Sequence, residues 1–401
     1  MSLTAVDERT PTERTPVMCP SCFGSACSFI YEVKRVPTNS CLLVDTREEA
    51  LAFPTGEIAL YVCGGCGFGF NARWEAGRTH YSERYEETQG FSPTFAAFDR
   101  DLASGIVDRR RLHGKRILEI GCGKGEFLAL LCEIGGNEGV GYDPSFVPAR
   151  RPGHNRLRFV REFVDDGTEI IGFDLLCCKM TLEHISEAGR FIGNVRHAIA
   201  HSPRAVFFIQ VPNFDYILRE RAHWDIYYEH CSYFTAASLC DLLERARFEI
   251  LRTWTDYNDQ YLMVEARPRR SGTTRRSNRL PFPESVRDFS SAVTEHQARW
   301  RERFRTCKGQ GLRTALWGSG SKAVSFLTSA GLGEEVDVVI DINPFRQGKY
   351  MPGSGHLIVS PETAASIQPD MVVVMNPVYV PEIRERFMLD GWRPELLSIL
   401  Q

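Results

Sequence analysis

Two short glycine-rich turns constrain the fold of this chain more than any other feature, because each follows an apolar strand and precedes a helix. The first turn lies in KRILEIGCGKGEF at 115–127, and the next apolar strand ends in Asp143. The second lies in TALWGSGSKA at 314–323, and its next strand ends in Asp341. A strand, a glycine turn, a helix and a strand with a terminal acid form the nucleotide-binding half of a doubly wound sheet. We therefore expect an α/β chain with two Rossmann-like units.

The first turn has the features of a site for S-adenosylmethionine (SAM) rather than for NAD. The NAD fingerprint places Gly or Ala three residues after its second glycine, and this chain has Glu126 there. An acid at the strand end followed by G-x-G-x-G instead resembles motif I of class I SAM-dependent methyltransferases. The resemblance implies that the turn holds the methionine part of the cofactor. The cofactor-binding residues that we expect are Glu119, Gly121, Gly123, Gly125 and Asp143.

The second turn does match the dinucleotide pattern G-x-G-x-x-A, at Gly318, Gly320 and Ala323, and Asp341 lies at the end of the next strand. NAD is therefore one candidate ligand of this unit. The alternative is a Rossmann-like unit whose turn holds another phosphate group or no ligand. An arginine-rich stretch with Ser, Thr, Gly and Pro, 267–281, separates the two units. Its composition is typical of an exposed linker and predicts a domain boundary.

Cysteines are concentrated near the start of the chain, since six of the 13 lie between Cys19 and Cys66. Two C-x-x-C motifs there predict zinc knuckles that together supply four thiolates. Four protein ligands leave no open coordination position, so we expect a structural zinc ion. A redox motif is disfavoured, because neither C-x-x-C precedes a βαβ pattern. The expected ligands are Cys19, Cys22, Cys63 and Cys66. The intervening segment contains three apolar runs that predict short strands, at 29–33, 41–44 and 58–62.

Charge and hydropathy limit the function classes. The 48 Lys and Arg nearly cancel the 51 Asp and Glu, leaving a formal charge of −3, which disfavours a zinc ribbon that binds nucleic acid. No apolar run approaches the roughly 18–20 residues of a membrane span, and the first residues are polar and lack the apolar core of a signal peptide. We therefore expect a cytoplasmic protein with neither nucleic-acid nor membrane partners, whose thiols stay reduced.

Two segments carry titratable side chains suited to proton transfer. An apolar strand at 173–178 is followed by Thr-Leu-Glu-His-Ile, which places His184 at the carboxyl edge of the first sheet, where open α/β sheets bind ligands. A capping or core role is the other interpretation of this histidine. The stretch HWDIYYEHCSYF at 223–234 is denser in aromatic and titratable residues than a surface loop, and predicts a pocket segment. The candidate catalytic residues are His230, Tyr227, Glu229 and His184.

These motifs together resemble the zinc-containing, SAM-dependent deoxysugar C-methyltransferases of antibiotic and surface-polysaccharide pathways. The resemblance includes Glu-His-x-x-Tyr-Phe at 229–234 and Asp-x-Asn-Pro-Phe-x-Gln-Gly-x-Tyr-x-Pro-Gly at 341–353. It covers nearly the whole chain and implies a class I methyltransferase core, a small N-terminal zinc-binding subdomain and a Rossmann-like C-terminal domain that closes the pocket. The implied boundaries are 1–80 for the zinc subdomain, 81–266 for the SAM-binding core and 267–401 for the linker and C-terminal domain.

The resemblance also implies the reaction, which is methylation of a carbon next to the ketone of a nucleotide-linked keto-deoxysugar. We expect His230 to be the base, and Tyr227 to position it or share the proton. His184 and Tyr227 are candidate donors to the enolate oxygen. The family's aromatic lid segment falls on 81–95. Further residues expected to contact the substrate are Tyr81, Tyr85, Asn213, Tyr233, Gln260 and Lys322.

The chain departs from the family at two places that we expect to contact the substrate. Many members have His-Gly-Gly-Ser-x-Arg where this chain has Tyr-Asn-Asp-Gln-Tyr-Leu at 257–262. The C-terminal turn reads Gly-Ser-Gly-Ser-Lys-Ala at 318–323 instead of Gly-Ala-Pro-Ala-Lys-Gly-Asn. An O-, N- or C-methyltransferase of another small metabolite is therefore the first alternative, and an NAD-dependent sugar-modifying enzyme is the second. The expected oligomeric state is a monomer or a homodimer.

Overall fold

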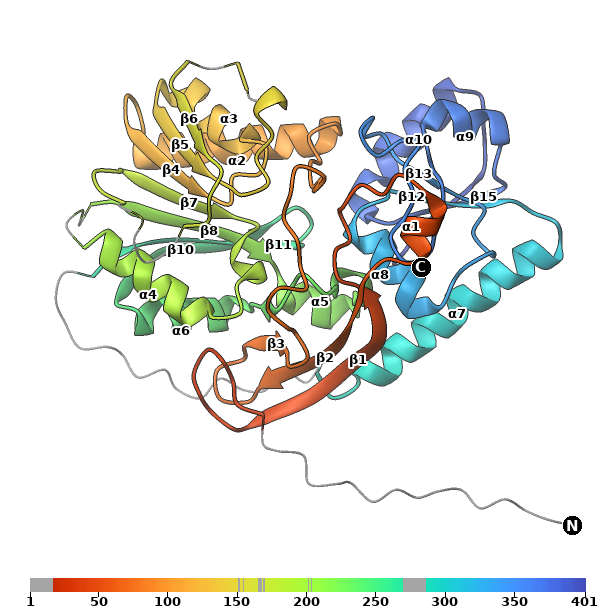
Figure 1. Ribbon diagram of the computed structural model, residues 1–401, viewed down its shortest axis with the longest axis horizontal. Helices are drawn as coiled ribbons and strands as arrows, with labels where there is room; N and C mark the ends of the chain where they lie inside the picture. The colour runs from red at the N-terminus through yellow and green to blue at the C-terminus, as the bar shows by residue number, and fades with distance from the viewer. Residues whose placement is uncertain are drawn as a thin grey trace, which may run out of the picture.

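The computed structural model of the chain describes residues 17–150, 152–153, 155–164, 168, 170–200, 202, 204–269 and 286–401. These residues form three sheets (Figure 1). A seven-stranded and a five-stranded sheet lie side by side, and a four-stranded sheet from the start of the chain lies below and between them.

The seven-stranded sheet has the order β10-β11-β8-β7-β4-β5-β6. Strands β4 to β8 run parallel, whereas β11 is antiparallel to both β8 and β10. The strands are β4 (Arg116–Ile120), β5 (Glu138–Tyr142), β6 (Leu157–Val160), β7 (Leu175–Lys179), β8 (Val206–Pro212), β10 (Phe248–Asp256) and β11 (Tyr261–Pro268). The helices that cover it are α2 (Pro93–Arg110), α3 (Glu126–Gly135), α4 (Ala188–Ala198) and α6 (Ala236–Arg245).

Helices α2 and α3 cover one face of this sheet, and α4 and α6 cover the other (Figure 1). Successive side chains of a strand point to opposite faces, so a strand covered on both sides must be apolar throughout. In β7, Leu175 and Cys177 pack in the core beside α2 and α3, whereas Leu176 and Cys178 pack in the core beside α4 and α6. This requirement explains the continuous apolar runs that predicted the strands.

The five-stranded sheet is parallel throughout, with the order β14-β13-β12-β15-β16. It confirms the second Rossmann-like unit that the second glycine turn predicted. The strands are β12 (Thr314–Trp317), β13 (Val338–Ile340), β14 (Ile358–Val359), β15 (Met371–Val374) and β16 (Glu395–Ser398). The helices are α7 (Phe289–Gly309), α8 (Ser321–Ala330), α9 (Pro361–Ile367) and α10 (Val380–Leu389).

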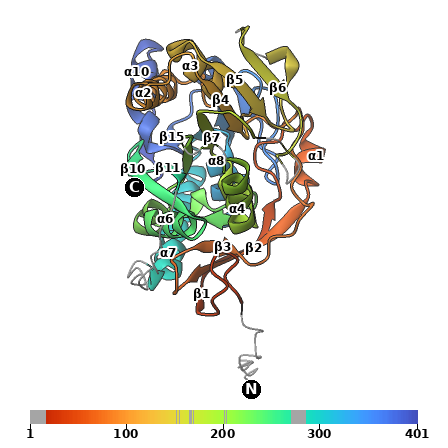
Figure 2. The same cartoon turned by 90° about the vertical axis from the view of Figure 1, so that its left-hand side faces the viewer.

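The four-stranded sheet is antiparallel and links distant parts of the chain. Its strands are β1 (Cys27–Pro37), β2 (Thr55–Cys63), β3 (Gly69–Asn71) and β9 (Ser232–Tyr233), the last from the aromatic segment. A helix, α1 (Arg47–Leu51), precedes β2. A continuous apolar core runs from β1 and β2 through α5 (Phe214–Glu220) and the 3₁₀ turn η3 (His223–Asp225) to α8. Figure 2 shows the same sheet below the seven-stranded one after a 90° turn. The aromatic segment is thereby fixed between all three sheets.

Two expectations for connecting segments are wrong. Residues 41–44 form no strand, because their backbone pairs with a neighbouring loop and not with a sheet. Leu43 N–H donates to Arg84 O at 2.9 Å, and Leu42 makes only an isolated bridge with Tyr85. The linker begins later than expected, since β11 continues through Pro268 and residues 270–281 lie outside the described residues.

Candidate active site

The first glycine turn, between β4 and α3, requires glycine at three positions. Gly121, Gly123 and Gly125 have φ of 71°, 54° and 81°, in the left-handed region that favours glycine. Asp143 follows β5, and its Oδ2 accepts a hydrogen bond from Gly123 N–H at 2.8 Å. A side chain at each glycine would collide in turn with Thr181, Glu87 and Phe159. Both the backbone conformation and the close packing of the turn therefore require glycine at these positions.

Glu119 ends up in the interior two residues before the turn, with 2% of its surface exposed. Cys177 Sγ lies 3.7 Å from its Oε1, whereas Oε2 has no hydrogen-bond partner in the described part of the chain. Burial raises the pKa of Glu119 to about 8, an effect that nearby Lys179 opposes in part. The strand-end acid of the motif is therefore a buried carboxyl with one free oxygen. A glycine turn held in the left-handed conformation and a buried acid with an unpartnered oxygen together fit SAM.

The four candidate catalytic residues lie together, although they come from segments far apart in sequence. His184 ends the 3₁₀ turn η2 (Leu182–His184) after β7, and its Nδ1 is 2.9 Å from the Tyr81 hydroxyl. The His184 and His230 rings meet edge to face, with centroids 4.8 Å apart. The Tyr227 and His230 ring centroids are 4.0 Å apart. Burial lowers the pKa of His184 to about 4, so this imidazole is neutral at physiological pH.

Glu229 is held by the N-terminal part of the chain. Its Oε1 accepts hydrogen bonds from Ser40 N–H at 2.5 Å and from Ser40 Oγ at 2.7 Å, while Oε2 is buried without a partner among the described residues. Burial raises the pKa of Glu229 to about 7. The Ser40 hydroxyl also lies 2.7 Å from Ser321 Oγ, at the start of α8. Through Ser40, Glu229 therefore connects the aromatic segment to the loop after β1 and to the start of α8 in the five-stranded unit.

Glu183 belongs to this cluster although the sequence did not single it out. Its Oε1 lies 4.0 Å from His230 Nε2, and its ligand atom, with those of His184 and His230, falls within a spread of 4.8 Å. The signal for Glu183 was its position directly before His184 in Thr-Leu-Glu-His-Ile. The pattern of apolar residues around Glu183 did not indicate that its carboxyl is buried.

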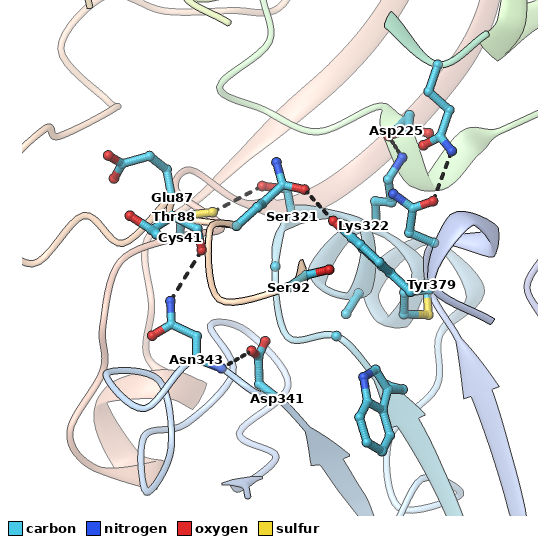
Figure 3. Close-up of a pocket in the computed structure, with 18 of the residues that line it drawn as sticks. Cys41, Glu87, Thr88, Ser92, Asp225, Ser321, Lys322, Asp341, Asn343 and Tyr379 are labelled. Carbon is cyan, nitrogen blue, oxygen red and sulfur yellow. Dashed lines mark hydrogen bonds and ion pairs between the residues drawn. The ribbon is translucent and has the colours of Figure 1, made fainter. Parts of the chain in front are cut away.

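A cavity lies between the two Rossmann-like units (Figure 3). The seven-stranded unit contributes Met180, Tyr227 and Gln260, and the N-terminal segment contributes Cys41. The five-stranded unit contributes the start of α8, including Gly320, Ser321 and Lys322. Other side chains on the wall are those of Glu87, Thr88, Ser92, Asp225, Asp341, Asn343 and Tyr379. Tyr227 is therefore the candidate catalytic side chain on the cavity wall, and His230 lies beside it, further from the cavity.

The expected substrate-contacting residues divide between the cavity and the interior. Lys322 forms an ion pair with Asp225 on the wall (Figure 3). Gln260 Nε2 donates to Asn376 Oδ1 at 2.9 Å. Asn213 instead caps α5, accepting from Asp215 N–H at 3.1 Å. The other three are packed in the interior or around His184: Tyr233 in β9, Tyr81 against His184, and Tyr85 against Tyr81. Of the six, Gln260 and Lys322 line the cavity.

The second glycine turn faces the same cavity but is built differently. Gly318 has a φ of 101°, whereas Gly320 has an ordinary φ of −77°, and a Cβ there would meet no atom within 4 Å. Asp341 Oδ2 accepts from Ser319 N–H at 2.8 Å and from Ser319 Oγ at 2.5 Å. Asp341 Oδ1 accepts from Asn343 N–H at 2.8 Å. Both carboxylate oxygens of the expected ribose-binding acid are thus engaged by the protein.

The four expected zinc ligands form one cluster at the edge of the four-stranded sheet. Cys19 Sγ and Cys66 Sγ are 3.8 Å apart, and Cys22 Sγ and Cys63 Sγ are 3.5 Å apart. All four sulfur atoms lie within 4.8 Å of one another. A tetrahedral zinc ion with bonds of about 2.3 Å sets its sulfur ligands about 3.8 Å apart. The donor set and its spacing therefore fit zinc.

The seven-stranded sheet is parallel except for β11, the second strand from one edge, and a glycine turn follows β4. This topology defines a class I SAM-dependent methyltransferase. A family model described as "Methyltransferase domain" matches residues 95–253, and one described as "C-methyltransferase C-terminal domain" matches 273–389. A C-methyltransferase, NovU, from Streptomyces niveus is 28% identical over 320 residues, which are 73% of this chain and 75% of the relative. The chain is therefore an enzyme, a SAM-dependent C-methyltransferase.

Solved methyltransferase structures resemble parts of the chain. The N,N-8-amino-8-demethyl-D-riboflavin dimethyltransferase RosA from Streptomyces davawensis has 23% identity and a TM-score of 0.36, over 43% of this chain and 55% of that one. A 1,6-didemethyltoxoflavin-N1-methyltransferase from Burkholderia thailandensis, bound to S-adenosylhomocysteine (SAH), has 22% identity and a TM-score of 0.33, over 43% and 78%. These scores are too low to bear on the acceptor. In the described ranges, no helix is both long and apolar enough to cross a membrane.

Proposed function

We propose that this C-methyltransferase methylates a carbon next to the ketone of a nucleotide-linked deoxysugar, through an enolate. The observation that carries the proposal is the composition of the cavity wall. Tyr227 and Met180 lie on the side of the methyl donor, and Ser321 and Lys322 lie at the N-terminus of the ten-residue helix α8. Unpaired N–H groups and the helix dipole at such an end attract phosphate. A keto-sugar therefore suits the first side and its diphosphate suits the second.

We assign SAM to the first glycine turn, where it would supply a methyl group already activated by its bond to a sulfonium. Gly121, Gly123 and Gly125 allow the methionine part close to the backbone, and Asp143 suits the ribose hydroxyls. Glu87 extends from the turn to the cavity, since it both packs against Gly123 and lines the cavity wall. The cofactor and the acceptor would therefore meet near Glu87.

The proposed reaction begins with removal of a proton from the acceptor carbon. The C–H bond breaks, the proton passes to His230 next to Tyr227, and the electron pair forms an enolate. Tyr227, which lines the cavity, is the first candidate donor to the enolate oxygen, and neutral His184 is the second. SAM bound at the first glycine turn would supply the methyl group for the new carbon–carbon bond to the enolate carbon, and breaking its carbon–sulfur bond would leave SAH. Burial of these side chains keeps water from the enolate.

We further propose a structural zinc ion at Cys19, Cys22, Cys63 and Cys66. Its role is to fix the β1–β2 hairpin at its Cys27 and Cys63 end, since the opposite end of the same hairpin leads to Ser40 and Cys41 at the cavity. Metal analysis should find one zinc per chain, and chelation should lower the melting temperature and weaken acceptor binding. A chain that contains no zinc and keeps its melting temperature in chelator would contradict this proposal.

The second turn is proposed as a wall of the acceptor site and not as an NAD site. Gly320, Ser321 and Lys322 of this turn line the same cavity as Tyr227 and Gln260, which supports a role in holding the acceptor. Titration with NADH should show no binding, whereas SAH should bind. The division at 1–80, 81–266 and 267–401, the monomeric or homodimeric state and the cytoplasmic location stay predictions.

The experiment that tests the function is mass spectrometry of products from a panel of nucleotide-linked keto-sugars incubated with SAM. A gain of one methyl group on a keto-sugar is the expected result. Methylation of oxygen or nitrogen in another metabolite, with no product from any keto-sugar, would overturn the sugar assignment and favour the first alternative.

A further inference from the structure

Glu183 presents an unexplained buried carboxyl. It is 1% exposed, and neither carboxylate oxygen has a hydrogen-bond partner within the described ranges. Leaving such a group unpaired costs roughly 1–3 kcal/mol, so an orphaned carboxyl in a native fold needs a reason. No packing requirement supplies one, because a glutamine or a leucine has a similar size. The reason for this carboxyl is therefore sought in its neighbour, His230.

The backbone fixes Glu183 against the aromatic segment. Cys231 N–H donates to Glu183 O at 3.0 Å, and Ser232 Oγ donates to Ile185 O at 2.8 Å. These two bonds join η2 to the residues just after His230. The 4.0 Å separation between Glu183 Oε1 and His230 Nε2 is therefore set by main-chain contacts on both sides.

The order of groups leads away from the cavity. Tyr227 lines the cavity, the His230 ring is 4.0 Å from the Tyr227 ring, and Glu183 lies beyond His230. His230 is 2% exposed and its Nδ1 has no partner within the part of the chain that is described. A proton that reaches this imidazole enters a buried site, where a lone positive charge is costly.

Burial acts on the two groups in opposite directions. It raises the pKa of Glu183 to about 8, and it lowers the pKa of His230 well below its ordinary value, with nearby His184 and Lys322 adding to that effect. Each group alone resists charge. Above about pH 8, where Glu183 is ionised, uptake of a proton by His230 leaves the pair without net charge, so it removes a buried charge instead of creating one.

We propose that Glu183 is the positioning residue of the base, acting as the carboxylate that orients His230 and balances its charge while it holds the proton taken from the acceptor carbon. The proton leaves His230 for solvent after product release, so the pair returns to its starting state. The inference rests on the proposed function, because it requires proton removal from the acceptor.

The test replaces the carboxyl and keeps its shape. Glu183→Gln should lower kcat by about 100-fold or more, within the range of general base catalysis, with KM for the acceptor within about threefold of wild type. SAH affinity and melting temperature should stay close to wild type. Glu187→Gln is the matched control, because Glu187 lies on the surface of the same segment and pairs with Arg190. It should keep wild-type kcat.

Deuterium exchange separates this inference from the proposed function. With SAH in place of SAM, wild type should exchange the proton on the acceptor carbon with deuterated solvent, and Glu183→Gln should exchange it at least about 100-fold more slowly. Glu183→Asp keeps the charge and should recover part of the exchange. Equal exchange by wild type and Glu183→Gln would overturn the role of Glu183 alone. Absence of exchange in wild type would overturn the enolate and this inference with it.

Discussion

The two glycine turns share a motif and a topology, yet they differ in backbone conformation and packing. Both follow the first strand of a parallel sheet, and both are tied by a hydrogen bond to an acid after the next strand, Asp143 or Asp341. In the first, three glycines have positive φ and each is closely packed. In the second, Gly318 has positive φ, while Gly320 has an ordinary φ and open space around it.

This difference shows that a G-x-G pattern reports the fold more directly than it reports a ligand. Thr181, Glu87 and Phe159 pack closely against the three glycines of the first turn, which is the turn that we propose for the cofactor. The second turn is open because Gly320 faces the cavity, and no atom lies within 4 Å of a Cβ added there. Substitutions that affect one turn and not the other therefore test the division of labour between cofactor and acceptor.

The largest effect is expected from Gly123→Ala in the first turn. Alanine at a φ of 54° costs about 1–2 kcal/mol, and its Cβ would also displace Glu87. We expect SAH affinity, measured by calorimetry, to fall about 100-fold. Unchanged SAH affinity would remove the basis for placing the cofactor at this turn.

Lys322→Gln should act on the acceptor side with a smaller effect. It removes a positive charge at the start of α8 that is paired with Asp225, so KM for a nucleotide-linked keto-sugar should rise about tenfold while SAH affinity stays constant. Lys349→Gln is the control, because Lys349 pairs with Asp45 away from the cavity wall. A lower SAH affinity in Lys322→Gln with an unchanged acceptor KM would reverse the assignment of the two turns.

The first unit carries a buried acid, Glu119, before its turn, whereas the second has Leu316 and Trp317 there. We therefore expect the first turn alone to make the free energy of unfolding depend on pH through this position. Burial raises the pKa of Glu119 to about 8, above its unfolded value near 4.5. The neutral carboxyl therefore contributes stability fully below pH 4.5 or so, and this contribution is lost as pH rises through 8. The free energy of unfolding should fall by roughly 1 kcal/mol per pH unit between pH 6 and 8. Denaturant titration of Glu119→Gln should show a slope shallower by about this amount, because the raised pKa values of Glu183 and Glu229 keep their own contributions in this pH range. An equal slope in both proteins would show that Glu119 does not contribute.

The smallest effect is expected from Gly320→Ala in the second turn. Its φ of −77° suits alanine, and the added Cβ meets open space. We expect an unchanged melting temperature, unchanged SAH affinity and at most about a threefold change in acceptor KM, about 0.6 kcal/mol. A loss of SAH binding in this variant would show that the two turns are not independent.

Local patterns predicted what depends on local physics. The two Rossmann-like units followed from apolar strands and glycine turns, and the four cysteines followed from their spacing. The site was harder, because Ser40, Glu183, His230 and Ser321 are brought together only by the packing of three sheets. Ser40 carried no signal at all, and residues 41–44 resembled a strand although their hydrogen bonds go to a neighbouring loop. His184 and His230 were found because each lies in an unusual segment, whereas Glu183 differs from a surface acid only in its burial.

The most direct test of the central claim is where the transferred methyl group ends up. Wild-type enzyme should be incubated with a nucleotide-linked keto-sugar and SAM labelled with carbon-13 in its methyl group, and the product examined by NMR spectroscopy. The account predicts a labelled methyl group bonded to the ring carbon next to the ketone. A labelled methyl group on oxygen or nitrogen would contradict it.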